Sequence, residues 1–313
     1  MSNTQIFHLT SKDRHPETAD LTQFLTQSEG ADTIVGPHAR VYKCELHYES
    51  TTKIVAVKRI YPRGATPEDI ERVDVRVRRE IVVWIGLEHE NIVQLLGTTE
   101  KNQDFPSIGM VSEWMENGNL WSYIKETRPL IDRLQLSMHP TISTDLSKLV
   151  HSQRVIHGDL TSANVLIDNN GRARLVDFGL SSIIAAFEGT SLMASAIGGA
   201  LRFRAMELMP PLEEDPTNFD PKLTTACDIY SLGSVTLQIL SGQQPYYNIN
   251  DDVLVALALT QRKTPDRPDT QKLVDRNEYW DFIQKCWRKD PVTRPNAEEA
   301  RDELFRLRKV VLA

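Results

Sequence analysis

Two carboxylates and one carboxamide lie close together in the sequence, in a pattern suited to holding a metal ion and orienting a hydroxyl group. Asp159 and Asn164 stand in the segment His-Gly-Asp-Leu-Thr-Ser-Ala-Asn at 157–164, and Asp177 opens the tripeptide Asp-Phe-Gly. Mg²⁺ prefers oxygen ligands and usually takes only one or two of them from the protein. Phosphoryl transfer mainly requires positioning and neutralisation of charge, so these three side chains suit that chemistry.

The residues between Asn164 and Asp177 predict a hairpin that brings these two side chains together. Short apolar runs at 165–167 and 174–176 are typical of strands. The Asp-Asn-Asn-Gly stretch at 168–171 predicts a turn between them, because Asn and Gly tolerate positive φ. Since a hairpin folds back on itself, Asn164 and Asp177 should lie side by side at its open end.

A second candidate group lies in the N-terminal part of the chain. Lys58 ends the apolar strand pattern Val-Ala-Val-Lys at 55–58. If this ammonium faces inward it requires a counter-charge, because burying an unpaired charge is costly. Glu80 is the candidate partner, on a long helix expected from Pro67 to about Leu87. Taken alone, such a strand is more often an edge strand with a surface lysine, and the motifs at 157–164 and 177–179 reverse that preference.

These segments together resemble the catalytic domain of eukaryotic protein kinases. The resemblance extends over about residues 30–308, and the C-terminal part is most similar to tyrosine-kinase-like Ser/Thr kinases. It implies an α+β fold with a small β-rich N-terminal lobe and a larger helical C-terminal lobe. It also implies phosphoryl transfer from ATP, with Mg²⁺, to a protein substrate.

The resemblance assigns a role to each candidate residue. Asp159 would accept the proton of the substrate hydroxyl, and Asn164 and Asp177 would hold Mg²⁺. Lys58 would contact the ATP phosphates and Glu80 would fix Lys58. The remaining expected nucleotide contacts are Gly36 in the phosphate loop, Val41 and Ala56 above the adenine, Leu166 below it, and backbone atoms of Glu113 and Met115 at its edge.

Three further residues match the family in the C-terminal part. Glu207 and Arg294 should form a buried ion pair that tethers the segment after Asp177 to the last helices. Asp228 begins an apolar helix, where a carboxylate can accept backbone N–H groups. In the family this residue braces the catalytic loop, which corresponds to residues 157–164 here. His157 should brace the same loop rather than act as a base.

The sequence departs from the family at the glycine-rich loop. Aligned on Val41, the three glycine positions hold Ile34, Gly36 and Ala39, so only one glycine is present. Side chains there hinder the close approach of backbone N–H groups to phosphate. Thr161 stands where Ser/Thr kinases have a lysine that steadies the transferred phosphate.

Two other departures concern control and the fold. Gly158 replaces an Arg that usually binds a phosphate on the activation segment, so control by phosphorylation at Ser181, Ser182, Thr190, Ser191 or Ser195 is less expected. An insertion near Met138–Thr141 contains Pro140, which should break or kink the surrounding helix.

The pattern of elements predicts the domain organisation. Residues 1–18 are polar and unpatterned, which is typical of a disordered tail, and one kinase domain follows over 19–308. We expect an N-terminal lobe at about 30–112, a hinge at 113–118 and a C-terminal lobe at 119–308. A short helix is expected from Asp20, before the first lobe.

Composition narrows the class of protein. The net charge of −7 argues against nucleic acid as the main partner. Cys44, Cys227 and Cys286 are widely spaced, which suggests neither a zinc site nor a disulfide framework. Met1–Thr10 lacks the apolar core of a signal peptide, and the apolar run Val253–Leu259 is too short to span a bilayer. We expect no membrane insertion and a cytoplasmic location, with the nucleus left open.

Two alternatives compete with an active kinase. The altered residues Ile34, Ala39, Thr161 and Gly199, the last in place of a family Thr, also suit a pseudokinase, which is a nucleotide-binding or scaffolding module with little catalysis. The His-Gly-Asp triplet at 157–159 also occurs in small-molecule phosphotransferases related to aminoglycoside kinases. Glu207, Asp228 and Arg294 argue against that second alternative.

Overall fold

The computed structural model describes ten ranges of the chain, which divide into two compact units. The first unit comprises the residues up to Glu88 together with Val93–Trp114, and the second comprises His89–Ile92 and the residues from Met115 onward. The described ranges are 18–27, 33–36, 39–48, 50–61, 66–101, 107–125, 156–178, 199–212, 218–269 and 277–312. The tail up to residue 17, the insertion near Pro140 and the five Ser and Thr residues considered for control by phosphorylation lie outside them.

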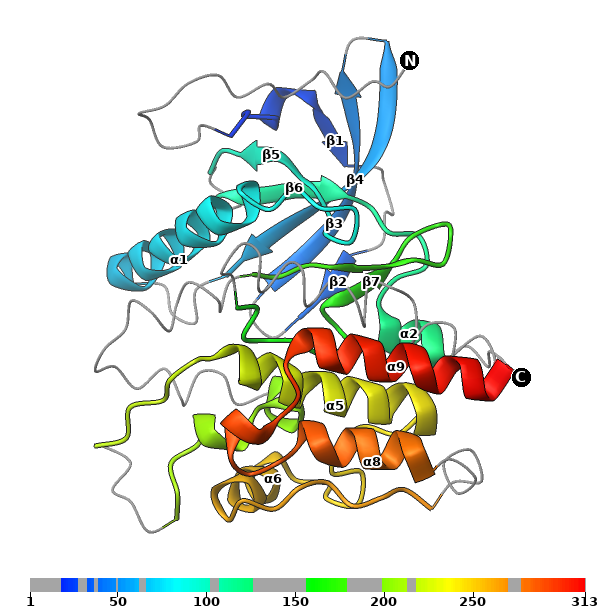
Figure 1. Ribbon diagram of the computed structural model, residues 1–313. Coiled ribbons are helices and arrows are strands. Elements are labelled where there is room, and N and C mark those ends of the chain that lie inside the picture. The colour runs from blue at the N-terminus through cyan, green and yellow to red at the C-terminus, as the bar shows by residue number, and fades with distance from the viewer. Residues whose placement is uncertain are drawn as a thin grey trace. The chain divides into compact units, whose positions relative to one another are not determined.

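The first unit is built on an antiparallel sheet (Figure 1). Its order is β1-β3-β4-β6-β5, and β2 pairs with β3. The long hairpin of β3 and β4 contains the strand predicted from the pattern at 55–58, and each of its two strands places every second side chain on one face. The strands are β1 Leu25–Gln27, β2 Thr33–Val35, β3 Ala39–Tyr48, β4 Thr51–Ile60, β5 Leu95–Thr99 and β6 Gly109–Glu113.

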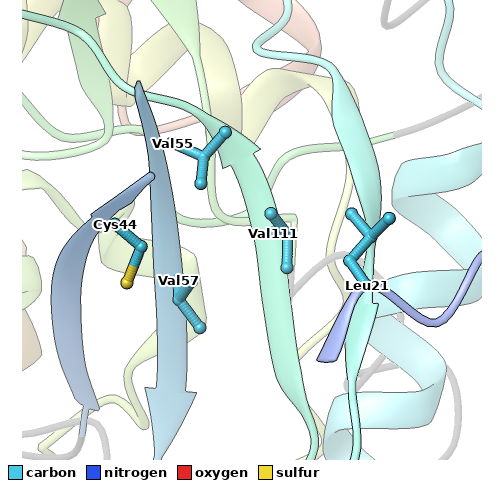
Figure 2. Packing of buried hydrophobic residues seen from close by; sticks show 5 residues of the cluster. All are labelled: Leu21, Cys44, Val55, Val57 and Val111. Atoms are coloured by element: carbon cyan, nitrogen blue, oxygen red, sulfur yellow. The ribbon is translucent and has the colours of Figure 1, made fainter. Parts of the chain in front are cut away.

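One face of this sheet forms an apolar core under the N-terminal segment. Figure 2 shows Leu21 with side chains from three strands, all of them buried. These strand residues are Cys44 on β3, Val55 and Val57 on β4, and Val111 on β6. Because side chains alternate along β4, the intervening residues Ala56 and Lys58 point to the opposite face.

The segment Thr18–Phe24, which we call the strap, runs along the edge strand β5. The backbone N–H of Leu21 donates to Thr98 O at 2.8 Å, and the N–H of Thr98 donates to Ala19 O at 2.9 Å. The expected helix from Asp20 is a single 3₁₀ turn over Thr22–Phe24, after which the chain enters β1. The pairing of β1 with β3 limits this turn to three residues, so the sheet of the first unit begins before residue 30.

Helix α1 spans Pro67–Ile85 and confirms the long helix expected there. Thr66 caps its N-terminus, because its hydroxyl oxygen accepts the backbone N–H of Asp69 at 3.2 Å. Trp84, near its end, is buried and donates its indole N–H to Val93 O at 2.7 Å. The helix is therefore tied to the stretch that leads into β5.

The second unit is mainly helical. Helix α5 is buried from Cys227 to Ser241 and packs against α8, where Gly233 comes so close to Cys286 that a Cβ would meet that side chain at 2.8 Å. Gly242 ends α5 in the left-handed conformation at φ 73°. The α-helices in the described part of this unit are α2 Leu120–Lys125, α5 Thr225–Ser241, α6 Asp252–Thr260, α8 Asn277–Cys286 and α9 Ala297–Leu312. None of the helices in the described ranges combines the length and the apolar character needed to cross a bilayer.

Candidate active site

A two-stranded hairpin positions the metal-binding candidates. β7 Val165–Ile167 pairs with β8 Ala173–Leu175 in antiparallel register, which confirms the predicted hairpin with its second strand one residue earlier. Gly171 closes the turn at φ 75°, a value that favours glycine. The N–H of Val176 donates to Asn164 O at 3.1 Å, so Asn164 and the residue before Asp177 are neighbours, as predicted.

Asn164 is oriented by Asp159. Its amide nitrogen Nδ2 donates to the backbone oxygen of Asp159 at 2.9 Å and to the Asp159 Oδ2 at 3.1 Å. Because both contacts use Nδ2, the opposite end of the carboxamide, Oδ1, is directed away from Asp159. An oxygen presented in this way has the donor chemistry that Mg²⁺ prefers.

Asp177 has an unusual backbone conformation. Its φ is 69°, in the left-handed region that costs about 1–2 kcal/mol for a residue with a side chain. The next residue, Phe178, is fully buried, and its ring lies 5.0 Å from the ring of His157. Packing of Phe178 against His157 offsets the strain at Asp177.

His157 and Asp228 brace the catalytic loop from below. Asp228 accepts the backbone N–H groups of His157 at 2.8 Å and Gly158 at 2.9 Å. The His157 ring contacts Val176 O through Nε2 at 3.1 Å and the N–H of Asp159 through Nδ1 at 3.3 Å. Since Nδ1 accepts a hydrogen bond, the proton of a neutral ring resides on Nε2, which donates to Val176 O.

Burial shifts the pKa values of this pair in opposite directions. It lowers the pKa of His157, although the nearby charge of Asp228 opposes the change. Burial also raises the pKa of Asp228, against the effects of His157 and the two backbone N–H donors. A neutral imidazole that holds two backbone groups is a structural brace, as the sequence predicted for His157.

Gly158 is required by the shape of the loop. Its φ is 76°, and a Cβ built there would meet Leu223 Cδ2 at 2.9 Å. A side chain at this position would be strained and would displace Leu223. The departure from the family at residue 158 is therefore matched by the packing around it.

The predicted ion pair of Glu207 and Arg294 is present in the second unit. Two parallel hydrogen bonds join them, from Nη1 to Oε1 at 2.6 Å and from Nη2 to Oε2 at 2.7 Å. Arg294 also donates to Ala226 O at 2.8 Å, so the pair is tied to the start of α5. This two-point geometry fixes the segment that follows residue 199 against the helices.

In the first unit, Lys58 and Glu80 form the predicted ion pair. Lys58 Nζ donates to Glu80 Oε1 at 2.9 Å, and the Glu80 side chain is 0% exposed while that of Lys58 is 17% exposed. Val41 lies opposite Lys58 in the sheet, and Ala56 lies opposite Ser112. Val41, Ala56 and Lys58 therefore share one face of the sheet, away from the core in Figure 2.

The degenerate glycine loop still forms a hairpin. β2 pairs with β3, with Ile34 opposite Val41, and the N–H of Gly36 donates to Ala39 O at 2.8 Å. Ile34 is 55% exposed, so its bulky side chain is tolerated in solvent. The strands before and after the loop are thus retained without the other two glycines.

The remaining nucleotide candidates are placed as follows. Glu113 ends β6, and its carboxylate forms an ion pair with Lys53. The contact of its backbone with adenine stays a prediction. Met115 is buried in the second unit. Leu166 lies on β7 and forms an isolated bridge with Asn119.

Sequence reasoning missed two arginines in the turns before Glu207. Arg202 is buried, donates to the carbonyl groups of Pro245, Tyr246 and Ile249, and pairs with Asp252. Arg204 is partly buried, and its charge interacts with that of Asp159. The available signal was their alternation around Phe203, in a stretch that is otherwise apolar.

Comparisons with known proteins agree with this geometry. The family model described as the protein kinase domain matches residues 35–305. A probable serine/threonine-protein kinase of Dictyostelium discoideum is 29% identical over 250 residues, which cover 80% of this chain and 45% of that protein.

Two plant proteins show the same relationship. The probable serine/threonine-protein kinase SIS8 of Arabidopsis thaliana is 30% identical over 280 residues, covering 88% of this chain and 24% of the relative. The serine/threonine/tyrosine-protein kinase HT1 of Arabidopsis thaliana is 26% identical over 298 residues, covering 94% of this chain and 69% of the relative. The chain thus spans less than half the length of the first two relatives. With the family model matched over most of its length, the chain belongs to the protein kinase family.

Proposed function

We propose that this protein is an active kinase that transfers the γ-phosphoryl group of ATP to Ser or Thr residues of a protein substrate. The observation that carries the proposal is the pair of hydrogen bonds made by Asn164. Its side-chain Nδ2 donates to the Asp159 carboxylate, and its backbone oxygen accepts the N–H of Val176, the residue before Asp177. A proton acceptor and two oxygen donors are thereby held by one hairpin. The Ser/Thr preference is supported by the names of the Dictyostelium relative and SIS8, whereas the name of HT1 also includes tyrosine.

Each side chain has a distinct part in the proposed reaction. Asp159 orients the substrate hydroxyl and accepts its proton as the oxygen attacks phosphorus. Asn164 and Asp177 supply oxygen ligands to Mg²⁺, and Lys58, held by Glu80, donates to phosphate oxygens. ATP supplies the phosphoryl group, and Mg²⁺ neutralises the phosphate charge.

The residues present fit these two groups. Mg²⁺ is usually held by one or two protein oxygens in phosphoryl-transfer sites, which matches Asn164 and Asp177. Gly36, Val41, Ala56, Glu113, Met115 and Leu166 are the proposed contacts for the rest of the nucleotide.

A pseudokinase is the second candidate, and one observation favours it. The Thr161 hydroxyl accepts the N–H of Ala163 at 3.2 Å and is buried within its own loop. The position therefore offers no cation to a transferring phosphate, and such a loop is compatible with nucleotide binding without turnover.

Phosphate transfer to myelin basic protein with labelled Mg-ATP separates the two candidates. We expect the Asp159→Asn variant to lose activity by 10²–10⁴-fold, which is the usual contribution of a positioned general base. Equal rates in the wild type and the variant would exclude the kinase proposal. A rise in melting temperature with Mg-ATP in an inactive wild type would then establish the pseudokinase. Phosphorylation of small alcohols but of no protein would point to a small-molecule phosphotransferase.

A further inference from the structure

The catalytic loop itself carries one carboxylate and no strong cation. Residues 157–164 include Asp159 but neither Lys nor Arg, and the buried His157 is neutral at physiological pH because burial lowers its pKa. Asp228 lies close enough below the loop for its charge to act on Asp159. A carboxylate surrounded in this way benefits from a positive charge supplied by another segment.

Helix α5 brings such a segment to the loop. Asp228 accepts the backbone N–H groups of His157 and Gly158, immediately before Asp159. One turn later, the hydroxyl of Ser231 donates to Phe203 O at 2.9 Å, immediately before Arg204. Residues three apart on a helix are neighbours on its surface, about 5–6 Å apart at Cβ. The same face of α5 therefore anchors the catalytic loop and the turn that carries Arg204.

Arg204 also has a fixed backbone. Its N–H donates to Leu201 O at 3.1 Å, at the end of the 3₁₀ helix Gly199–Phe203. On the other side, Glu207 is held by Arg294 through two hydrogen bonds. The turn is thus secured before and after Arg204.

The charge of Arg204 acts on Asp159. Partial burial lowers the pKa of the Arg204 guanidinium, and the negative charge of Asp159 opposes that change. Guanidinium groups stay protonated in proteins, so Arg204 is a cation at physiological pH.

We propose that Arg204 is a positioning residue for phosphoryl transfer, which holds the Asp159 carboxylate in its reactive direction and offsets the surrounding negative charge. This inference rests on the proposed kinase function. It assigns to the turn after residue 203 a role that the catalytic loop cannot fill with its own side chains.

Arg202 provides a natural comparison on the same turn. Its guanidinium is occupied by three backbone carbonyl groups and by Asp252, which are all remote in sequence from the catalytic loop. Arg202 therefore braces the fold, whereas Arg204 acts on the residue proposed to accept the proton. The two arginines should respond differently to substitution.

The test compares Arg204→Met, Arg204→Lys and Arg202→Lys in phosphate transfer to myelin basic protein. Methionine keeps the length of the side chain and removes its charge, so it should fold. We expect Arg204→Met to lower kcat by 10- to 100-fold while KM for ATP and the Mg-ATP-induced rise in melting temperature stay unchanged. Arg204→Lys should restore kcat to within about fivefold of wild type, because it restores the charge. Arg202→Lys should lower the melting temperature and leave kcat intact.

The outcomes separate this inference from the kinase proposal. A wild type that is no more active than Asp159→Asn removes both. An active wild type with Arg204→Met within threefold of its kcat removes only the role of Arg204. A loss in Arg204→Lys as deep as that in Arg204→Met also overturns the inference, since charge would then not be the property that matters.

Discussion

At the scale of single residues, the carboxylate of Asp168 stabilises the turn between β7 and β8. Asp168 Oδ1 accepts the backbone N–H groups of Asn170 and Arg172, each at 2.9 Å. Its Oδ2 accepts Arg172 Nε at 3.1 Å and the Arg174 guanidinium at 3.2 Å. The turn that joins β7 to β8 is therefore fixed by one side chain, and with it the spacing of Asn164 and Asp177.

This arrangement predicts a defined pH dependence for Asp168→Asn. Burial raises the pKa of Asp168, but the backbone N–H groups and Arg174 outweigh burial and lower it below its ordinary value of 3.8. Because the pKa of Asp168 is lower in the folded protein, its ionised carboxylate stabilises the fold fully above pH 3.8. This stabilisation is lost as the pH falls through the pKa of the folded protein. We expect the variant to be less stable than wild type by about 1–3 kcal/mol at pH 7.

Urea denaturation between pH 7 and 3.5 measures the difference in stability between wild type and Asp168→Asn. This difference should begin to narrow at the acidic end. Asp269→Asn is the control, because Asp269 is exposed and its substitution should cost less than about 0.5 kcal/mol. A difference that widens towards acid would contradict the role of the charged carboxylate.

At the scale of elements, the strap and β5 form one packed edge of the first unit. Gly97 lies under the strap, and a Cβ there would meet Ala19 O at 2.5 Å and the Leu21 side chain at 2.7 Å. The pairing of β5 with β6 also shifts register between Leu95 and Gly97. The absence of a side chain at Gly97 therefore lets the strap approach the sheet and bury Leu21.

We expect Gly97→Ala to destabilise the protein by about 1–3 kcal/mol, because the backbone oxygen of Ala19 must move. Chemical denaturation measures the loss, and amide exchange at Leu21 and Thr98 reports whether the strap has opened. Gly86→Ala is the matched control, since its Cβ would find its nearest neighbour, Val83 O, at an ordinary 3.6 Å. If both variants unfold at the wild-type denaturant concentration, the strap is not closely packed on β5.

At the scale of the whole molecule, the proposed function requires residues from both units. Lys58 and Glu80 belong to the first unit, whereas Asp159, Asn164 and Asp177 belong to the second. Each group is held by its own unit, through the sheet and α1 in one case and through the hairpin and α5 in the other. If both groups of residues serve one reaction, both should contribute to the binding of Mg-ATP, and a melting-temperature measurement can test this.

Mg-ATP should raise the melting temperature, since a ligand at 100 times its Kd adds about 2.7 kcal/mol of stability. We expect both Lys58→Met and Asp177→Asn to reduce this rise, because each removes one class of contact with the phosphates or the metal. Lys53→Met is the control for Lys58→Met. Lys53 lies on the same strand, and its position in the alternation places it on the other face.

A reduction in only one of the two variants would show that nucleotide binding depends on one unit alone. Equal shifts in all the proteins would place the ligand elsewhere on the molecule.

The sequence by itself determined the family, the α+β fold and the local chemistry. The hairpin from 165 to 175, the helix from Pro67 and the pairing of Lys58 with Glu80 all follow from patterns over a few residues or from the cost of a buried charge. The family motifs at 157–164 and 177–179 then predicted which of these groups take part in the proposed reaction.

Only the tertiary structure decided which distant segments meet. The strap was expected to begin a short helix. Its pairing with β5, about 80 residues away, and the pairing of the following strand β1 with β3, about 20 residues away, override the local preference. Likewise, no sequence pattern around Arg204 predicts its interaction with Asp159. Their proximity arises because α5 holds both segments through Asp228 and Ser231, and such contacts depend on the packing of a buried helix rather than on local periodicity.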